Sequence, residues 1–364
     1  MKIADITIYR IDLPLVTPYR LSYRTFESFE PILVEVRDTD GRVGWGEAHI
    51  SPGSSAETRD GGWAFTCRLA ETLVGATVES AKASVAAEME QSKVAATGLR
   101  SALEMLQKHP LLLVNAPLRL RLLSPLNANE PAAIAAEVED RLSEGFRTFK
   151  IKVGKDVDSD LARVAEIQTA VADRATLRID ANRAYDKAQG CRFAAALDPT
   201  GIELFEQPCA TEDWEANAAV ATVSSVPLML DEPICAIGDI ERAATIAGVG
   251  FCKLKLKRFG GLDMLYDALT RVRALGLEPV LGDGLGCEVS CWMEACVAAA
   301  TICNAGEFNG FLKPQARLFS EPLRFQQGEL ALPAGYWPEV DREVLQGHTV
   351  ARQRFAVSRV RLGG

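Results

Sequence analysis

Three acidic residues follow short, mainly apolar runs at nearly equal intervals. Asp180, Glu206 and Asp231 are 26 and 25 residues apart, and each comes directly after a run typical of a strand. Parallel strands lie about 4.8 Å apart, so these side chains can converge. Carboxylates that close repel one another unless a cation neutralises them, and Mg²⁺, with Mn²⁺ possible, suits oxygen ligands. One such acid can equally cap the next helix, but three in succession favour a metal site.

Lysines alternate with apolar residues in two further predicted strands. Lys150 and Lys152 are two residues apart, as are Lys253, Lys255 and Lys257, so within each strand they point to one face. If that face is a barrel interior, the ammonium groups need a partner or a function; alternatively they reach solvent at the rim. One amine on each side of a metal-chelated carboxylate could remove and return its α-proton. The cation and a neighbouring ammonium would both lower the lysine pKa toward the working pH.

From about residue 118 onward, short apolar runs alternate with amphipathic stretches of helical period. The predicted strands cover residues 118–125, 147–153, 176–182, 202–206, 227–231, 251–256, 278–283 and 305–309. The predicted helices cover residues 130–144, 157–173, 187–197, 212–223, 238–247, 261–275 and 287–302. Eight strands alternating with seven helices predict a parallel α/β barrel whose strand ends form a catalytic rim.

The first part of the chain has a different pattern. Strands are predicted over residues 3–14 and 31–48, with a hairpin turn at 38–41, and Ala- and Leu-rich helices follow up to about residue 107. A chain of 364 residues has room for a barrel with an attached module. We expect an α+β capping domain over 1–115, a barrel over 116–318 and a C-terminal segment, 319–364, that returns to the cap.

The composition argues against several classes of protein. Hydrophobic residues make up 48% and charged residues 24%, as in globular chains, and a net charge of −9 disfavours nucleic acid and anionic membranes as partners. No apolar run approaches the roughly 18 residues of a membrane span, and residues 1–9 lack the apolar core of a secretory signal. Nine cysteines without a Cys-x-x-Cys pair favour reduced thiols. We expect a cytoplasmic protein.

The order of these motifs resembles the enolase superfamily and, within it, the muconate lactonizing enzyme subgroup. The matching motifs are Val43-Gly44-Trp45-Gly46-Glu47-Ala48, Lys150-Ile151-Lys152, Asp180-Ala181-Asn182, Glu206-Gln207-Pro208, Asp231-Glu232-Pro233, and Lys255 followed by Gly260-Gly261. The resemblance covers about residues 3–310. It implies a modified (β/α)₇β TIM-type barrel under an N-terminal α+β capping domain.

The resemblance also implies roles for individual residues. The three strand-end acids would be the magnesium ligands. Lys152 and Lys255 would be the acid and base on opposite faces of the substrate, and the choice of Lys255 rests on the family register. Lys150 would be their electrostatic partner, and Asn182 and Glu232 would support the ligands.

Candidate substrate contacts lie in three segments. They are Tyr19, Arg20 and Arg24 in the cap loop, Asp283 and Glu288 near the seventh strand, and Glu307 and Asn309 on the last strand. The cap-loop arginines could grip a second anion, although an ordinary loop explains them equally well. Where relatives often carry an Asp-x-Asp pair on the last strand, this chain has Glu307-Phe308-Asn309. Trp292 could offer a cation–π face, but a core position suits it better.

Together these residues favour a Mg²⁺-dependent racemase or epimerase of an amino-acid derivative or dipeptide, acting through an enediolate. A muconate-type cycloisomerase, or a lyase that catalyses dehydration or an o-succinylbenzoate synthase-type β-elimination, would use the same constellation with one lysine as base. A hypothesis of another class is a non-catalytic barrel that binds an acidic metabolite. The expected partner is a small-molecule carboxylate substrate, and family precedent suggests a homo-oligomer.

Overall fold

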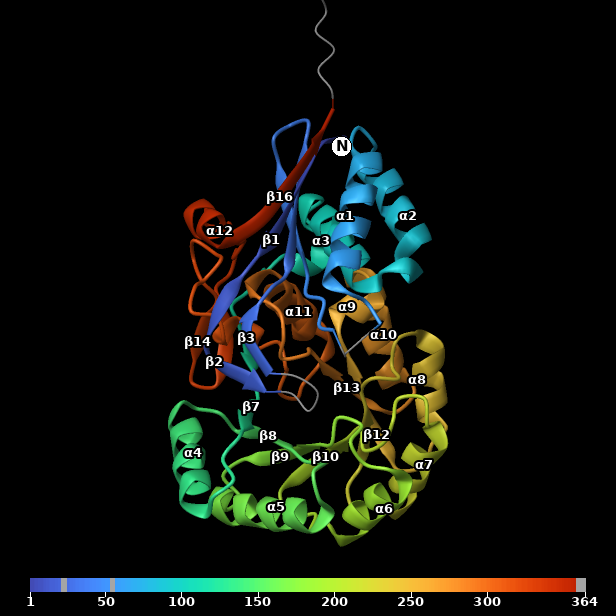
Figure 1. The fold of residues 1–364 in the computed structure, drawn as a ribbon, viewed down its shortest axis with the longest axis vertical. Helices are drawn as coiled ribbons and strands as arrows, with labels where there is room; N and C mark the ends of the chain where they lie inside the picture. The colour runs from blue at the N-terminus through green and yellow to red at the C-terminus, as the bar shows by residue number, and fades with distance from the viewer. Residues whose placement is uncertain (21–24, 53–55, 358–364) are drawn as a thin grey trace, which may run out of the picture.

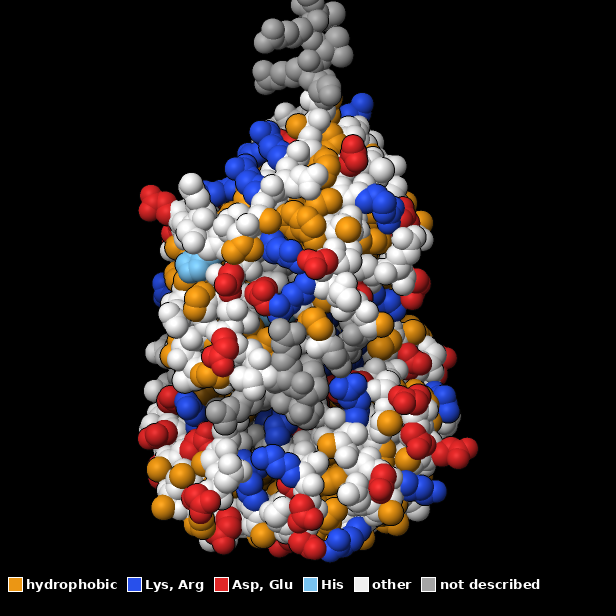
Figure 2. All heavy atoms as spheres, viewed as in Figure 1, with side chains coloured by type: hydrophobic (Ala, Val, Ile, Leu, Met, Phe, Trp, Pro, Cys, Tyr) orange, Lys and Arg blue, Asp and Glu red, His pale blue; other side chains and the backbone are white. Residues whose placement is uncertain are grey.

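The chain forms an antiparallel cap and a parallel barrel that pack against each other (Figure 1). The computed structural model describes residues 1–20, 25–52 and 56–357. The side chain of Arg20 and the whole of Arg24, both predicted substrate contacts, lie outside the described part. Within the described part, no helix is both long enough and apolar enough to cross a membrane. Acidic and basic side chains of the described residues are interspersed over the face shown in Figure 2.

The cap contains a four-stranded sheet in the order β16-β1-β4-β5. Its strands are β1 (Ile3–Ile11), β4 (Ile32–Asp38), β5 (Val43–Ala48) and β16 (Thr349–Ala356). Its helices are α1 (Arg59–Leu73), α2 (Val78–Glu88) and α3 (Lys93–Leu106). The C-terminal β16 pairs antiparallel with β1, which brings the two ends of the described chain together. A separate hairpin, β2 (Leu13–Arg20) and β3 (Thr25–Phe29), extends toward the barrel.

Two glycines allow helix α3 to lie directly on strand β5. Gly44 and Gly46 are two residues apart, so both face the same side of the sheet. A Cβ atom on Gly44 would overlap the carbonyl oxygen of Ala102, and one on Gly46 would overlap that of Gly98. The glycines of the Val-Gly-Trp-Gly-Glu-Ala hairpin are therefore required by close packing between helix and strand.

The barrel is a curled parallel sheet in the order β13-β12-β11-β10-β9-β8-β7. Its strands are β7 (Ser124–Leu126), β8 (Thr148–Lys152), β9 (Thr176–Asp180), β10 (Ile202–Glu206), β11 (Leu228–Leu230), β12 (Val249–Leu254) and β13 (Glu278–Leu281). The helices between and after them are α4 (Pro131–Ser143), α5 (Val157–Val171), α6 (Lys187–Ala196), α7 (Trp214–Val223), α8 (Ile237–Ala244), α9 (Leu256–Phe259), α10 (Leu262–Ala274) and α11 (Glu288–Thr301). The predicted barrel and cap are confirmed.

The two ends of the predicted barrel differ from expectation. Residues 118–125 do not form one strand, because β6 (Leu118–Arg121) pairs instead with β15 (Glu329–Leu332), which in turn pairs with β14 (Arg324–Gln326). Residues 305–309 do not form a strand. Gly306 makes an isolated bridge to Leu122, and Glu307 bonds through its backbone to Leu281 and Gly284 on the other edge, before the chain turns into the short helix η3 (Gly310–Leu312).

Alternation along the barrel strands separates an apolar layer from a charged layer. Leu204 lies two residues before Glu206, and Met229 lies two residues before Asp231, so each pair points to one face. Leu204, Met229 and Val280 form a small buried cluster inside the barrel. The acids lie one step nearer the carboxyl ends of the strands, at the rim.

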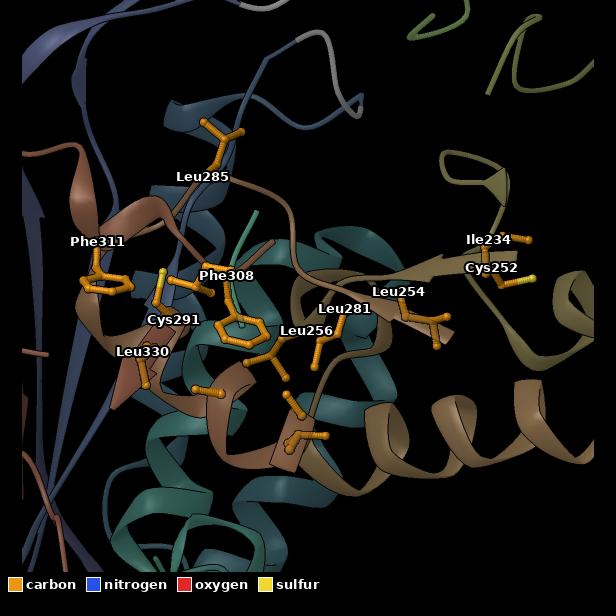
Figure 3. Packing of buried hydrophobic residues seen from close by; sticks show 14 of the residues in the cluster. Ile234, Cys252, Leu254, Leu256, Leu281, Leu285, Cys291, Phe308, Phe311 and Leu330 are labelled. Atoms are coloured by element: carbon orange, nitrogen blue, oxygen red, sulfur yellow. The ribbon is translucent and has the colours of Figure 1, made fainter. Parts of the chain in front are cut away.

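A larger buried cluster joins the outward faces of the barrel strands to the surrounding helices. Figure 3 shows part of it, including Leu254, Leu281 and Phe308. Leu254 and Leu281 are the residues that follow the inward-facing Lys253 and Val280, as strand alternation requires. This packing fixes which side chains of β12 and β13 point into the barrel.

The contact between α3 and β5 leads to a stability prediction. Gly46→Ala should lower the free energy of unfolding by about 1–3 kcal/mol, because the new methyl group forces the helix away from the strand. Gly238→Ala is the matched control, because a Cβ atom there meets no atom of the described residues within 4 Å. Thermal and urea unfolding measure both variants. Equal stability of Gly46→Ala and the wild type would contradict this account of the packing.

Candidate functional site

The three strand-end acids are buried at one rim of the barrel. Asp180 ends β9, Glu206 ends β10 and Asp231 directly follows β11; their side chains are 0–3% exposed. The sheet register pairs Asp180 with Glu206. Because parallel strands present their carboxyl ends together, three carboxylates share one small volume, as the sequence predicts.

The two lysines of β8 reach this cluster from one side. Lys150 Nζ lies 2.8 Å from Asp180 Oδ2 and 2.6 Å from Glu206 Oε2. Lys152 Nζ donates to the same oxygen of Asp180 and, over 2.5 Å, to Asn182 Oδ1. Lys150 is buried, whereas the side chain of Lys152 is 30% exposed at the cavity. Both lysines line the cavity, and Lys152 is the more accessible of the two.

Lysines from β12 reach the cluster from the other side. Lys253 Nζ lies 3.0 Å from Glu206 Oε1 and 2.5 Å from Glu307 Oε2. Lys255 Nζ lies 3.0 Å from Asp231 Oδ2. Lys152 and Lys255 thus approach from β8 and from the end of β12, with β9, β10 and β11 between them.

The prediction that Lys257 shares a strand face with the other two lysines is wrong. Strand β12 ends at Leu254, Lys255 precedes the short helix α9, and Lys257 lies within that helix. Its ammonium group pairs with Asp283 instead of with the strand-end acids. Gly260 closes the turn with φ 79°, a left-handed conformation that glycine adopts without strain.

Burial and neighbouring charge shift the pKa values of Lys150 and Lys255 in opposite directions. Burial alone would lower the pKa of Lys150, but Asp180 and Glu206 raise it well above its ordinary value. Burial lowers the pKa of Lys255, and Arg258 lowers it further, although Asp231 acts against both. Arg258 donates to Asp231 Oδ1 over 2.8 Å. Lys150 is therefore held as a cation, and Lys255 releases its proton more readily.

The donor set fits a hard divalent cation. All the strand-end donors are carboxylate oxygens, and burial together with Asp180 raises the pKa of Glu206 to about 7, so negative charge there is incompletely compensated. Glu232 Oε2 is buried and has no hydrogen-bond partner among the residues that the structure describes. The lysine ammonium groups hold the other oxygens, and within the described ranges no three acidic, His or Cys side chains form a ready-made metal site. A cation would compete with lysines for the same oxygens.

Four of the predicted substrate contacts lie around a cavity of 60 Å³ beside this cluster. Tyr19 and Asp283 line it, and Asp283 is paired with Lys257. Asn309 also lines it, but its amide is engaged with the carbonyl oxygen of Leu123. Glu307 lines it too, yet its carboxylate is bound by Lys150 and Lys253. The acids of this wall are therefore already neutralised.

The structure places two other residues away from the cavity. Glu288, predicted as a substrate contact, accepts hydrogen bonds from the backbone N–H groups of Phe319 (2.9 Å) and Leu323 (3.0 Å). It ties α11 to the C-terminal segment. Trp292 is fully buried and packs edge-to-face on Trp337, as expected for a core residue.

Sequence reasoning missed two residues of the site. Arg258, which binds Asp231, lies in α9 and has no strand pattern to mark it. Lys313 follows η3 and lines both the 60 Å³ cavity and an adjoining one of 820 Å³. Neither position follows from periodicity, because each depends on how a loop turns back over the strand ends.

Comparisons with known proteins agree with this fold and site. A family model described as "Enolase C-terminal domain-like" matches residues 133–336. An L-Ala-D/L-Glu epimerase of Bacillus subtilis is 28% identical over 92% of this chain and 95% of its own, and an aromatic dipeptide epimerase of Herpetosiphon aurantiacus is 32% identical over 76% and 81%. A solved mandelate racemase/muconate lactonizing protein from Herpetosiphon aurantiacus superposes with a TM-score of 0.84 at 28% identity, covering 93% of this chain and 99% of that one.

The chain belongs to the enolase superfamily, in its muconate lactonizing enzyme subgroup. Both named relatives are isomerases, and the chain is an enzyme of that class.

The position of Glu288 leads to a test that separates a structural role from substrate binding. Glu288→Gln should lower the free energy of unfolding by about 1–3 kcal/mol, since the new amide group cannot accept from both backbone donors. The Michaelis constant should not change. Glu166→Gln, on the exposed face of α5, is the control. A raised Michaelis constant with unchanged thermal stability would restore Glu288 as a substrate contact.

Proposed function

We propose that this enzyme is a Mg²⁺-dependent racemase or epimerase that moves the α-proton of a carboxylate substrate, an amino-acid derivative or dipeptide. One observation carries the proposal: Lys152 and Lys255 approach one carboxylate cluster from opposite sides of the barrel. A single base suffices for elimination or cycloisomerisation, but exchange of configuration requires a proton donor on the face opposite the base. The two-sided arrangement therefore favours racemisation or epimerisation.

The charged groups around the cluster have two roles, binding of the metal ion and stabilisation of negative charge. Asp180, Glu206 and Asp231 would hold Mg²⁺, which when bound neutralises charge on a substrate carboxylate. Lys150, held as a cation by Asp180 and Glu206, adds a fixed positive charge beside the same oxygens. Fixed charges in a site with little water stabilise the anion left when the α-proton departs.

The two lysines on opposite faces then transfer the proton. Lys255, whose pKa is lowered by burial and by Arg258, is suited to take the α-proton in its neutral form. Lys152, held by Asp180 and Asn182, delivers a proton to the other face. In the reverse direction the two lysines exchange roles, because the proton is then removed from the opposite face of the same carbon.

The relatives support an amino-acid derivative as substrate. The Bacillus subtilis and Herpetosiphon aurantiacus enzymes are named for epimerisation of L-Ala-D/L-Glu and of aromatic dipeptides. In both names the reaction inverts a carbon that carries a carboxylate or an amide. The same chemistry at Lys152 and Lys255 would serve this chain.

Solvent deuterium exchange at the α-carbon tests the two-sided mechanism. The substrates are N-acyl amino acids and dipeptides of both configurations. Lys152→Ala and Lys255→Ala should each lower the exchange rate of one enantiomer at least about 100-fold. Each should retain exchange with the other. Lys155→Ala, an exposed lysine just after β8, is the control. If neither variant changes turnover, the assignment of both lysines fails.

Titration calorimetry with Mg²⁺ tests the metal site without relying on turnover. Glu206→Gln should weaken binding at least about tenfold, because one of three anionic ligands is lost. The control is again Glu166→Gln. Unchanged Mg²⁺ affinity would place the metal elsewhere and leave the strand-end acids as partners of lysines only.

A further inference from the structure

Lys313 belongs to the wall that is common to the two cavities of the site. It lines the 60 Å³ cavity beside the catalytic lysines and the 820 Å³ cavity between the β2–β3 hairpin and α4. Both cavities also share Tyr19 and Asn309 in their walls. A substrate whose carboxylate lies among the lysines, and whose remainder extends into the larger cavity, would cross the wall that Lys313 shares with these residues.

The ammonium group of Lys313 is held in place by neutral partners. It donates to the carbonyl oxygen of Gly284 over 2.6 Å and to Asn309 Oδ1 over 2.9 Å. It also lies 4.6 Å from the centre of the Tyr19 ring. An ammonium has three N–H donors, so two fixed acceptors leave one for a ligand.

No acidic side chain among the described residues lies within 4.0 Å of this ammonium group. The two acids of the nearby wall are committed elsewhere, Asp283 to Lys257 and Glu307 to Lys150 and Lys253. Burial lowers the pKa of Lys313 to about 8, as expected for a cation without a counter-charge. A bound anion would offset this cost of burial.

The acids of the larger cavity are also engaged. Glu137 accepts from the backbone N–H groups of Asn127 and Ala128, and Glu144 pairs with Arg141. A substrate ammonium group would therefore meet the Lys313 cation without an uncommitted carboxylate beside it. Electrostatics at the common wall favour a negative group and oppose a positive one.

We propose that Lys313 binds a second anionic group of the substrate, a carboxylate at the end of an N-acyl chain, and discriminates against acyl chains that end in an ammonium group. This inference rests on the proposed function, since it supplies the substrate class for the same site. The preferred substrate is then an amino acid acylated by a dicarboxylic acid. A dipeptide with a free ammonium group is a poor substrate.

Three matched compounds test the proposal in the exchange assay. Each amino acid of a panel carries one of three N-acyl groups on chains of similar length. Succinyl ends in a carboxylate, its terminal amide ends in a neutral group, and γ-aminobutyryl ends in an ammonium group. Malonyl and glutaryl analogues vary the reach. The wild type should prefer the terminal carboxylate over the amide by about tenfold or more in kcat/KM, mainly through KM.

Variants then assign the preference to Lys313. Lys313→Gln should reduce the preference to within about twofold, Lys313→Arg should retain it, and Lys313→Glu should shift it toward the γ-aminobutyryl compound. Lys187→Gln, on the exposed start of α6, is the control. If the wild type does not distinguish carboxylate from amide, or if Lys313→Gln keeps the preference, the proposal is overturned. Thermal unfolding of each variant separates loss of fold from loss of contact.

Calorimetric binding distinguishes failure of this subsite from failure of the proposed chemistry. If no compound exchanges its α-proton, the racemase proposal fails, and binding decides the role of Lys313. N-succinylglycine should then still bind the wild type about tenfold more tightly than its terminal amide in the presence of Mg²⁺, and Lys313→Gln should remove the difference. Equal affinities in the wild type would overturn the subsite as well.

Discussion

The site depends on the mutual neutralisation of lysines and carboxylates inside the barrel. Transfer of an unpaired ion from water into a protein interior costs several kcal/mol, so neither set could be buried alone. Lys150 is shared by Asp180, Glu206 and Glu307, and Lys253 bridges the last two. These acids thus compensate the charge of the buried lysines, and a cation would have to compete with the lysines for the strand-end oxygens. The balance also holds Lys150 as a cation, whereas burial and Arg258 lower the pKa of Lys255.

Buried carboxylates of the cap hold it over the barrel rim. Glu47 on β5 accepts from the backbone N–H groups of Cys287 and Ser290 at the start of α11. Glu104 on α3 accepts from Leu262 N at the start of α10. Helix N-termini attract anions because their first N–H groups lack intrahelical partners. These contacts fix the cap, whose β2–β3 hairpin brings Tyr19 to the cavity wall.

The sequence predicted the strand-end acids and the paired lysines because both follow from local rules. Alternation assigns side chains to one face of a strand, and the βα period brings successive strand ends to one rim. Prediction from the sequence failed where a strand ended early or a loop turned back. Lys257 left the strand face because β12 ends at Leu254, and Glu288 proved to bind the tail through Phe319 and Leu323. No local sequence pattern indicated that Glu288 would bind the C-terminal segment.

The sequence by itself determined the barrel, the cap and the order of charged residues along the rim, because each depends on spacing within one strand or one βα unit. Only the tertiary structure decided which charges are compensated. Glu307 is 157 residues from Lys150, and no periodicity links them. That long-range pairing engages the acid on the last strand, whereas the hydrogen-bond partners of Lys313 within the described ranges are neutral. Charge compensation in a closed barrel is a property of residues distant in the chain, so the charge distribution around the cavity is decided only on folding.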